Sequence, residues 1–165
     1  MRSLAQILLI GFAGLALAAP ATSQRADNQL QPRSVELQRQ AKALMATGKF
    51  DQSADLLETA LAVDPRNRWA YVDLARVAEK QRLFGKAIRM TNKALALDPN
   101  DADAIAVQGE AMVELGAVAR AQANLQKLQT ICGRTSCPQI AALSAAISRG
   151  PTVASAKAPE SPKTN

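Results

Sequence analysis

The sequence predicts an all-α fold, an α-solenoid of three helical hairpins followed by a C-terminal capping helix. The segment Ala60–Asn67 recurs as Ala94–Asp101 at an offset of 34 residues, a period typical of stacked helical hairpins. Aromatic residues make up only 3% of the chain while alanine is abundant, which favours helix-on-helix packing over a sheet. An alanine-rich helical bundle with coincidental spacing is the alternative, but three aligned units argue against it.

Residues 1–23 have the pattern of a cleaved secretory signal peptide. Arg2 precedes an unbroken apolar run from Ile7 to Ala19, and small residues follow it. The run is shorter than the roughly 20 apolar residues of a membrane span, although an uncleaved anchor is the alternative. We therefore expect an exported protein, periplasmic or secreted, without a stable membrane span. A flexible linker is predicted at residues 24–33.

Three units, at about residues 34–67, 68–101 and 102–135, are predicted within a domain at 34–149. Small residues in register would let the two helices of each hairpin approach closely: Ala41, Ala75 and Gly109. Gly48 and Gly116 also match, and glycine there can end the first helix in a left-handed conformation, whereas the middle unit has Arg82. The second helix of the first two units ends at Asp-Pro, after which Asn67 or Asp101 can cap the next helix.

These residues resemble tetratricopeptide repeats over roughly Ser34 to Thr135. Matching positions in the first unit are Leu37, Leu44, Gly48, Phe50, Leu57, Ala60 and Pro65, and in the second Tyr71, Leu74, Ala75, Phe84, Ala87, Ala94 and Pro99. The third unit keeps Gly109, Gly116, Ala121 and Leu125. It departs from the family pattern at Leu128 and Gly133, as terminal repeats often do.

The C-terminal part divides into a helix and a tail. A helical stripe of Ile140, Leu143, Ala146 and Ile147 predicts a capping helix at 138–148, because a solenoid must cover its last apolar face. Residues 150–165 are rich in alanine, serine, proline and lysine, so we expect a disordered tail.

Cys132 and Cys137 are the only cysteines. In an exported protein a structural disulfide is the default interpretation, and it would hold the capping helix onto the solenoid. A redox pair, a metal site and two free thiols are the alternatives. Four intervening residues are unusual for a redox pair, and the chain has no histidine to complete a metal site.

Composition disfavours several function classes. The formal net charge of +6 is spread along the chain rather than gathered in a stripe, so we expect no nucleic-acid partner. The chain has no histidine, the commonest general base, and no nucleophile or phosphate-binding motif. We expect no enzyme activity, and no catalytic residue, cofactor or metal.

The resemblance implies that the first helices of the hairpins line a concave groove for a protein or extended-peptide partner. The groove residues carried over from the family are Gln38, Arg39, Lys42, Trp69, Asp73, Arg76, Asp103, Glu110 and Glu114. Trp69 is the best hot-spot candidate, with packing at the repeat junction as its alternative. The charged residues could instead be ordinary solvated surface.

One binding mode of the family is not expected here. Some members grip the acidic C-terminus of chaperones through basic and amide side chains, whose positions here hold Gln38, Lys42, Asp73, Asp103 and Ala106. Two carboxylates would repel such a ligand.

The sequence therefore predicts a non-enzymatic adaptor of the bacterial periplasm that binds a peptide segment or an envelope-assembly partner. A structural or self-oligomerising module of an envelope complex is the alternative, so a homo-oligomer is possible.

Overall fold

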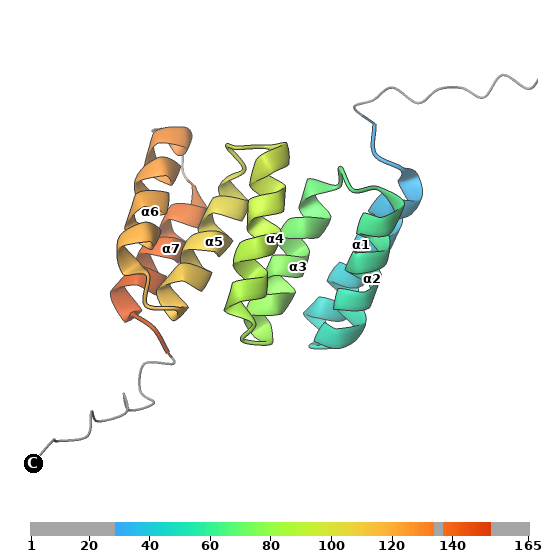
Figure 1. The fold of residues 1–165 in the computed structure, drawn as a ribbon, viewed down its shortest axis with the longest axis horizontal. Helices are drawn as coiled ribbons and strands as arrows, with labels where there is room; N and C mark the ends of the chain where they lie inside the picture. Colours follow the sequence, from blue (N-terminus) through green and yellow to red (C-terminus); the bar gives the residue numbers. More distant parts are fainter. Residues whose placement is uncertain (1–28, 134–136, 153–165) are drawn as a thin grey trace, which may run out of the picture.

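The computed structural model describes residues 29–133 and 137–152, which form seven α-helices and no strand. The helices are α1 (Pro32–Ala46), α2 (Phe50–Val63), α3 (Arg68–Lys80), α4 (Phe84–Leu97), α5 (Ala102–Glu114), α6 (Val118–Cys132) and α7 (Pro138–Arg149). They form three successive antiparallel hairpins, α1/α2, α3/α4 and α5/α6, followed by α7 (Figure 1). The predicted all-α solenoid with a terminal helix is confirmed.

The helices form an inner and an outer row. In the inner row α1 contacts α3, α3 contacts α5, and α5 contacts α7. Within the described ranges, α2, α4 and α6 of the outer row make no comparable contacts with one another. Because one row is packed more closely than the other, the stack curves with its concave side along α1, α3, α5 and α7.

Small side chains let the helices pack closely. Ala41 and Ala75 are fully buried within their hairpins, as the register predicts. Gly109 in α5 serves a different contact, because a Cβ atom there would lie 2.6 Å from Cδ1 of Leu143 in α7. Glycine at this position is therefore what allows α7 to pack directly on α5.

The helix ends follow the expected signals. The side chain of Asn67 accepts a hydrogen bond from the Ala70 amide at 3.2 Å, and that of Asp101 accepts one from the Ala104 amide at 2.9 Å. Both residues thus cap the N-terminus of the following helix. In the turn after α3, Arg82 has a φ of 61°, so the middle hairpin adopts the left-handed turn without a glycine, at a backbone cost of about 1–2 kcal/mol.

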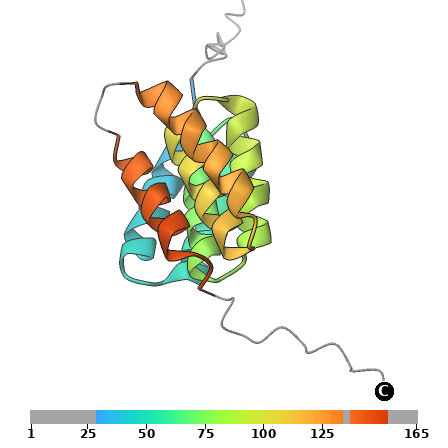
Figure 2. The ribbon, with the colours of Figure 1, turned by 90° about the vertical axis from the view of Figure 1, so that its left-hand side faces the viewer.

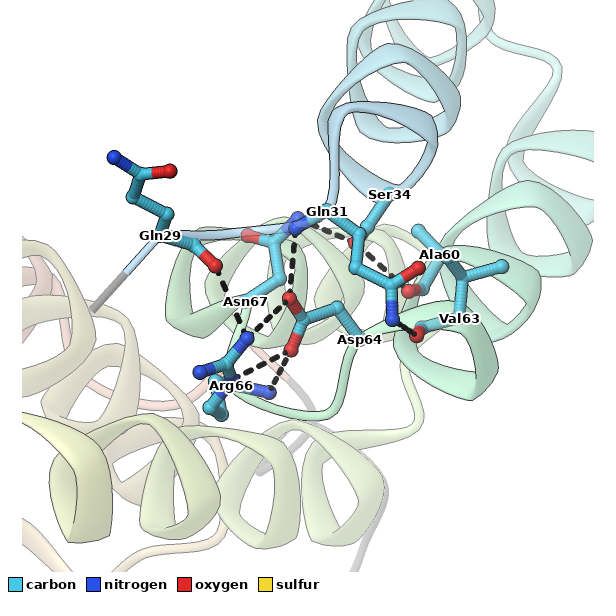
Figure 3. Close-up of polar contacts among 8 residues, drawn as sticks. All are labelled: Gln29, Gln31, Ser34, Ala60, Val63, Asp64, Arg66 and Asn67. Atoms are coloured by element: carbon cyan, nitrogen blue, oxygen red, sulfur yellow. Dashed lines mark hydrogen bonds and ion pairs between the residues drawn. The ribbon is translucent and has the colours of Figure 1, made fainter. Parts of the chain in front are cut away.

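Asp64 organises the turn between the first two hairpins (Figure 3). Its carboxylate accepts hydrogen bonds from the Gln31 amide at 2.8 Å and the Arg66 amide at 3.0 Å, and it pairs with the Arg66 guanidinium. Arg66 also donates to the Gln29 carbonyl at 3.0 Å. The turn therefore holds the residues that precede α1.

The start of α1 differs from the sequence prediction. The helix begins at Pro32, inside the segment 24–33 predicted as a flexible linker. Proline suits the first position of a helix because its missing N–H would be unpaired there anyway. The hydrogen bond from Gln31 to Asp64 then fixes the residue before it.

The C-terminal helix α7 lies beside α6 at the end of the stack (Figure 2). It ends at Arg149, one residue beyond the predicted boundary. Leu143 on its inner face is fully buried, so α7 covers the last apolar face of the solenoid as expected. Beyond α7, the backbone amide and the hydroxyl of Thr152 both donate to Glu114 Oε2.

Several sequence predictions fall on other parts of the chain. The predicted signal peptide at 1–23, residues 24–28 of the predicted linker and residues 153–165 of the predicted tail lie outside the described residues. Within the described residues, none of the helices has the length and apolar character needed to cross a membrane.

Candidate functional site

The concave side of the solenoid contains a pocket of about 540 Å³. Its walls come from α3, α5 and α7, together with Met45 near the end of α1 and Phe50 at the start of α2. Apolar side chains make up part of the lining: Met45, Phe50, Ala106, Val107, Pro138 and Ala142. The pocket thus spans the inner row from the first hairpin to the terminal helix.

A salt bridge crosses one wall of this pocket. Arg76 Nη2 on α3 donates to Asp103 Oδ1 on α5 at 2.6 Å. Gln139 Nε2 on α7 donates to the same oxygen at 3.1 Å. Asp103 therefore joins three helices of the inner row, and its charge is matched by Arg76.

Glu79 on α3 and Glu110 on α5 also line the pocket, and their electrostatic environment is different. Burial raises the pKa of Glu79 to about 8, and the neighbouring Glu110 charge adds to this rise. Burial also raises the pKa of Glu110 above its ordinary value, against the opposing effect of Arg76. These two carboxyl groups are partly desolvated without full compensation from nearby cations.

A second hollow, of about 290 Å³, adjoins the first. Glu79, Lys80 and Glu110 line both, so the two hollows share a wall. Glu114, Arg149 and Thr152 extend this wall toward the C-terminal end of α7. Together the hollows form the concave groove.

Four of the predicted groove residues face these hollows. Arg76, Asp103 and Glu110 line the larger hollow, and Glu110 and Glu114 line the smaller one. That any of them contacts a peptide stays a prediction.

Gln38 and Asp73 are placed differently from what a peptide contact requires. Gln38 Nε2 on α1 donates to Asp73 Oδ2 on α3 at 2.7 Å, and Asp73 is only 4% exposed. Burial raises the pKa of Asp73, although the bond from Gln38 opposes this. The geometry favours a structural role for the pair, joining two helices of the inner row.

Arg39, Lys42 and Trp69 lie outside the lining of both hollows. Arg39 pairs with Glu36 on the exposed surface of α1 at 2.6 Å. Trp69 is 47% exposed, and the Arg68 guanidinium lies 4.4 Å from its ring centroid. Trp69 is therefore not packed in the core of the repeat junction; it remains a candidate contact at the N-terminal end of α3.

Sequence reasoning missed several lining residues: Met45, Phe50, Glu79, Lys80, Pro138, Gln139 and Ala142. Lys80 could have been predicted from the repeat. It lies 34 residues before Glu114, a predicted groove residue, and so occupies the equivalent position in the preceding unit. The apolar stripe of α7 predicts a cap, and it does not indicate that α7 continues the inner row.

Comparisons with known proteins agree with this fold. The tetratricopeptide repeat family model matches residues 44–107, from the end of α1 into α5. Among solved structures, the tetratricopeptide domain of Sgt2 from Aspergillus fumigatus superposes with a TM-score of 0.66 at 21% identity, covering 73% of this chain and 80% of that one. The chain has the tetratricopeptide repeat fold.

Two further domains with this fold were solved as complexes. The TPR2B domain in a pHsp70 complex of yeast Sti1 has a TM-score of 0.66 at 20% identity, covering 72% of this chain and 98% of that one. The second tetratricopeptide domain of human RPAP3, in complex with the HSP70 peptide SGPTIEEVD, has a TM-score of 0.62 at 18% identity, covering 69% and 94%. No curated protein matches the chain.

Within the tetratricopeptide repeat fold, α1, α3 and α5 are the first helices of the three hairpins, and α7 extends their row. The helix therefore has two roles. It covers the apolar end of the stack through Leu143, and it supplies one wall of the concave pocket through Pro138, Gln139 and Ala142.

Proposed function

We propose that this protein is a non-enzymatic adaptor that holds a peptide segment of a partner protein in its concave groove. The observation that carries the proposal is the pocket of about 540 Å³ on the inner row of helices. Its volume falls in the range of about 300–1,000 Å³ typical of ligand sites. Its lining combines apolar side chains with charged groups that can orient a ligand.

The fold supports the same proposal. Structural neighbours were solved in complexes with pHsp70 and with the HSP70 peptide SGPTIEEVD. Their low identity relates them to this chain by fold alone, so the partner is not carried over.

We further propose that the adaptor works outside the cytosol, in the bacterial periplasm. The sulfur atoms of Cys132 and Cys137 lie at disulfide distance, and disulfides persist in oxidising compartments. A disulfide here would tie the end of α6 to the start of α7 and so support one wall of the pocket.

The groove proposal is tested by filling the pocket. Ala142 is exposed on α7 and lines the pocket, whereas Ala96 is exposed on α4 and lines neither hollow. A random peptide library is selected on the oxidised protein, and the affinities of the enriched peptides are measured for Ala142→Phe and Ala96→Phe. We expect Ala142→Phe to lose at least tenfold in peptide affinity and Ala96→Phe to keep the wild-type affinity. Equal affinities for the two variants would overturn the proposal.

A second candidate is self-association through exposed apolar residues. Val35 and Trp69 occupy equivalent positions one period apart and are 44% and 47% exposed. Light scattering after size-exclusion chromatography tests this candidate. A concentration-dependent dimer that is lost in Trp69→Ala would support it, and a monomer at all concentrations would exclude it.

A further inference from the structure

We propose that the shared wall of the two hollows binds a cationic side chain of the peptide, a lysine or arginine flanked by an apolar residue. This inference rests on the proposed peptide-binding function and names the chemistry of the ligand.

The first argument is the pair of carboxyl groups on that wall. Glu79 and Glu110 line both hollows. In the part of the chain that the structure describes, neither side chain makes a hydrogen bond or an ion pair, and their carboxyl oxygens remain accessible to solvent. Two half-buried carboxyl groups that face a pocket without partners are complementary to a ligand that brings positive charge and N–H donors.

The second argument is that the surrounding basic side chains are already paired or exposed to water. Arg76, the cation that lowers the pKa of both carboxyl groups most, is already paired with Asp103. Lys80 and Arg149 are exposed, so water screens their charges. Glu114, which also faces Glu79 from α5, adds negative charge. Burial is the first cause of the raised pKa of both carboxyl groups, and the nearby cations lower each pKa without offsetting it, so a ligand cation would stabilise their charged forms.

The third argument is the apolar lining beside the carboxyl groups. Phe50 and Met45 face the pocket from the first hairpin, Val107 from α5, and Ala142 from α7. Lysine and arginine bury their aliphatic stems along apolar surface while their charged ends reach a polar partner. The pocket therefore suits a basic side chain together with an apolar neighbour, and it disfavours an acidic peptide.

The test compares peptides that differ at one position. Three fluorescein-labelled nonapeptides share leucine-flanked alanine sequences and carry lysine, glutamine or glutamate at the centre. The acidic peptide SRMEEVD, which is bound in another tetratricopeptide domain, is a fourth probe. We expect fluorescence anisotropy to show the lysine peptide binding about tenfold more tightly than the glutamine peptide, with the two acidic probes weakest.

Variants then locate the preference. The pocket double variant combines Glu79→Gln and Glu110→Gln. In this variant, the ratio of the affinities for the lysine and glutamine peptides should fall toward one. The control Glu36→Gln, Asp55→Asn makes the same change of net charge at exposed positions outside both hollows and should keep the ratio. Equal binding of the lysine and glutamine peptides to the wild type, or an unchanged ratio in the pocket double variant, would overturn the inference.

A pH series adds a readout that a general charge effect would not give. Because burial raises the pKa of Glu79 to about 8 in the free protein, binding of a cation near neutral pH should release a proton from this group. The lysine preference should therefore increase from about pH 6 to about pH 9 in the wild type, and stay flat in the pocket double variant. A flat profile in the wild type would contradict the assignment of the cation to Glu79.

The outcomes also separate this inference from the proposed function. If the peptides bind and Ala142→Phe abolishes binding, but lysine is not preferred, the groove function stands and the cation inference is wrong. If Ala142→Phe binds the lysine peptide as tightly as the wild type does, the groove function is wrong and the inference falls with it.

Discussion

Asp64 shows how one side chain can hold several elements at once. Its carboxylate is 1% exposed and receives hydrogen bonds from the backbone of Gln31, before α1, and of Arg66, before α3 (Figure 3). The Arg66 side chain is the main reason that the pKa of Asp64 is lowered to about 2. The equivalent Asp98, one period later, accepts a hydrogen bond from the Asn100 amide within its own turn and pairs with the Arg68 side chain at 3.8 Å, but among the described residues it has no backbone donor outside that turn. Asp64 therefore stabilises the start of the solenoid in a way that the repeat pattern alone does not indicate.

Replacing Asp64 should reduce stability in a pH-dependent way. Asp64→Asn is expected to cost about 1–3 kcal/mol at neutral pH, because buried donors lose a charged acceptor. Since the folded pKa of about 2 lies below the ordinary value of 3.8, this contribution is present above the ordinary value and is lost as the pH falls through the folded one. Urea unfolding at about pH 7, 4 and 2 should show the variant and wild type converging at the lowest pH.

Asp55→Asn is the matched control for this prediction, because Asp55 is exposed on α2. It should leave the unfolding free energy within about 0.5 kcal/mol of wild type. A constant difference between Asp64→Asn and wild type across the pH range would contradict the role assigned to the charge.

Residue-level roles were only partly predictable from the sequence. The caps Asn67 and Asp101 follow from local rules, because a cap is decided within three residues. The family register predicts Gln38 and Asp73 in the groove, but the close approach of α1 and α3 buries them against each other. That burial depends on the distance between helices, which sequence spacing does not encode.

At the scale of elements, α7 depends on a close contact with α5. Gly109 faces Leu143, and a Cβ atom at Gly109 would approach its Cδ1 to 2.6 Å. The stripe of apolar residues predicted α7 as a cap, but it did not predict the glycine contact, because Gly109 was aligned with the hairpin-packing residues Ala41 and Ala75.

The contact predicts that Gly109→Ala changes the unfolding free energy in opposite directions in the wild type and in Leu143→Ala. Gly109→Ala should destabilise the wild type by about 1–3 kcal/mol through overpacking. In the background of Leu143→Ala, which itself should cost about 2–5 kcal/mol, the same change should stabilise by up to about 1 kcal/mol through helix propensity. Thermal or urea unfolding of the four proteins measures this cycle.

Gly85→Ala on α4 controls for propensity, because a Cβ atom there meets only Arg89 Nη1 at 3.7 Å. It should stabilise the protein in both backgrounds by up to about 1 kcal/mol. If Gly109→Ala behaves like Gly85→Ala in the wild type, α7 does not pack on α5 as described.

At the scale of the whole molecule, the period of 34 residues predicted the order of helices and the existence of a concave side. It did not predict the pocket. Met45 and Phe50 of the first hairpin line the same pocket as Pro138 and Ala142 of α7, across almost the entire domain. The first hairpin and α7 come close enough to line one pocket because the stack is curved. This curvature accumulates from the packing of all inner helices and is not visible in any single repeat.

The curvature also determines which surface a partner meets. Residues of α3, α5 and α7 converge on the pocket. Among the lining residues of the two hollows, α4 supplies only Phe84, in the smaller hollow, and α6 supplies none. A peptide held in the groove must therefore perturb the inner row and leave the outer row largely unchanged.

Amide chemical-shift mapping tests this central claim most directly. A peptide selected on the wild-type protein is titrated into isotope-labelled protein, and shift changes are assigned along the chain. We predict that the largest changes fall on α3, α5 and α7 around Glu79, Val107 and Ala142, and are absent in Ala142→Phe. Changes concentrated on the outer faces of α2, α4 and α6 would contradict the account.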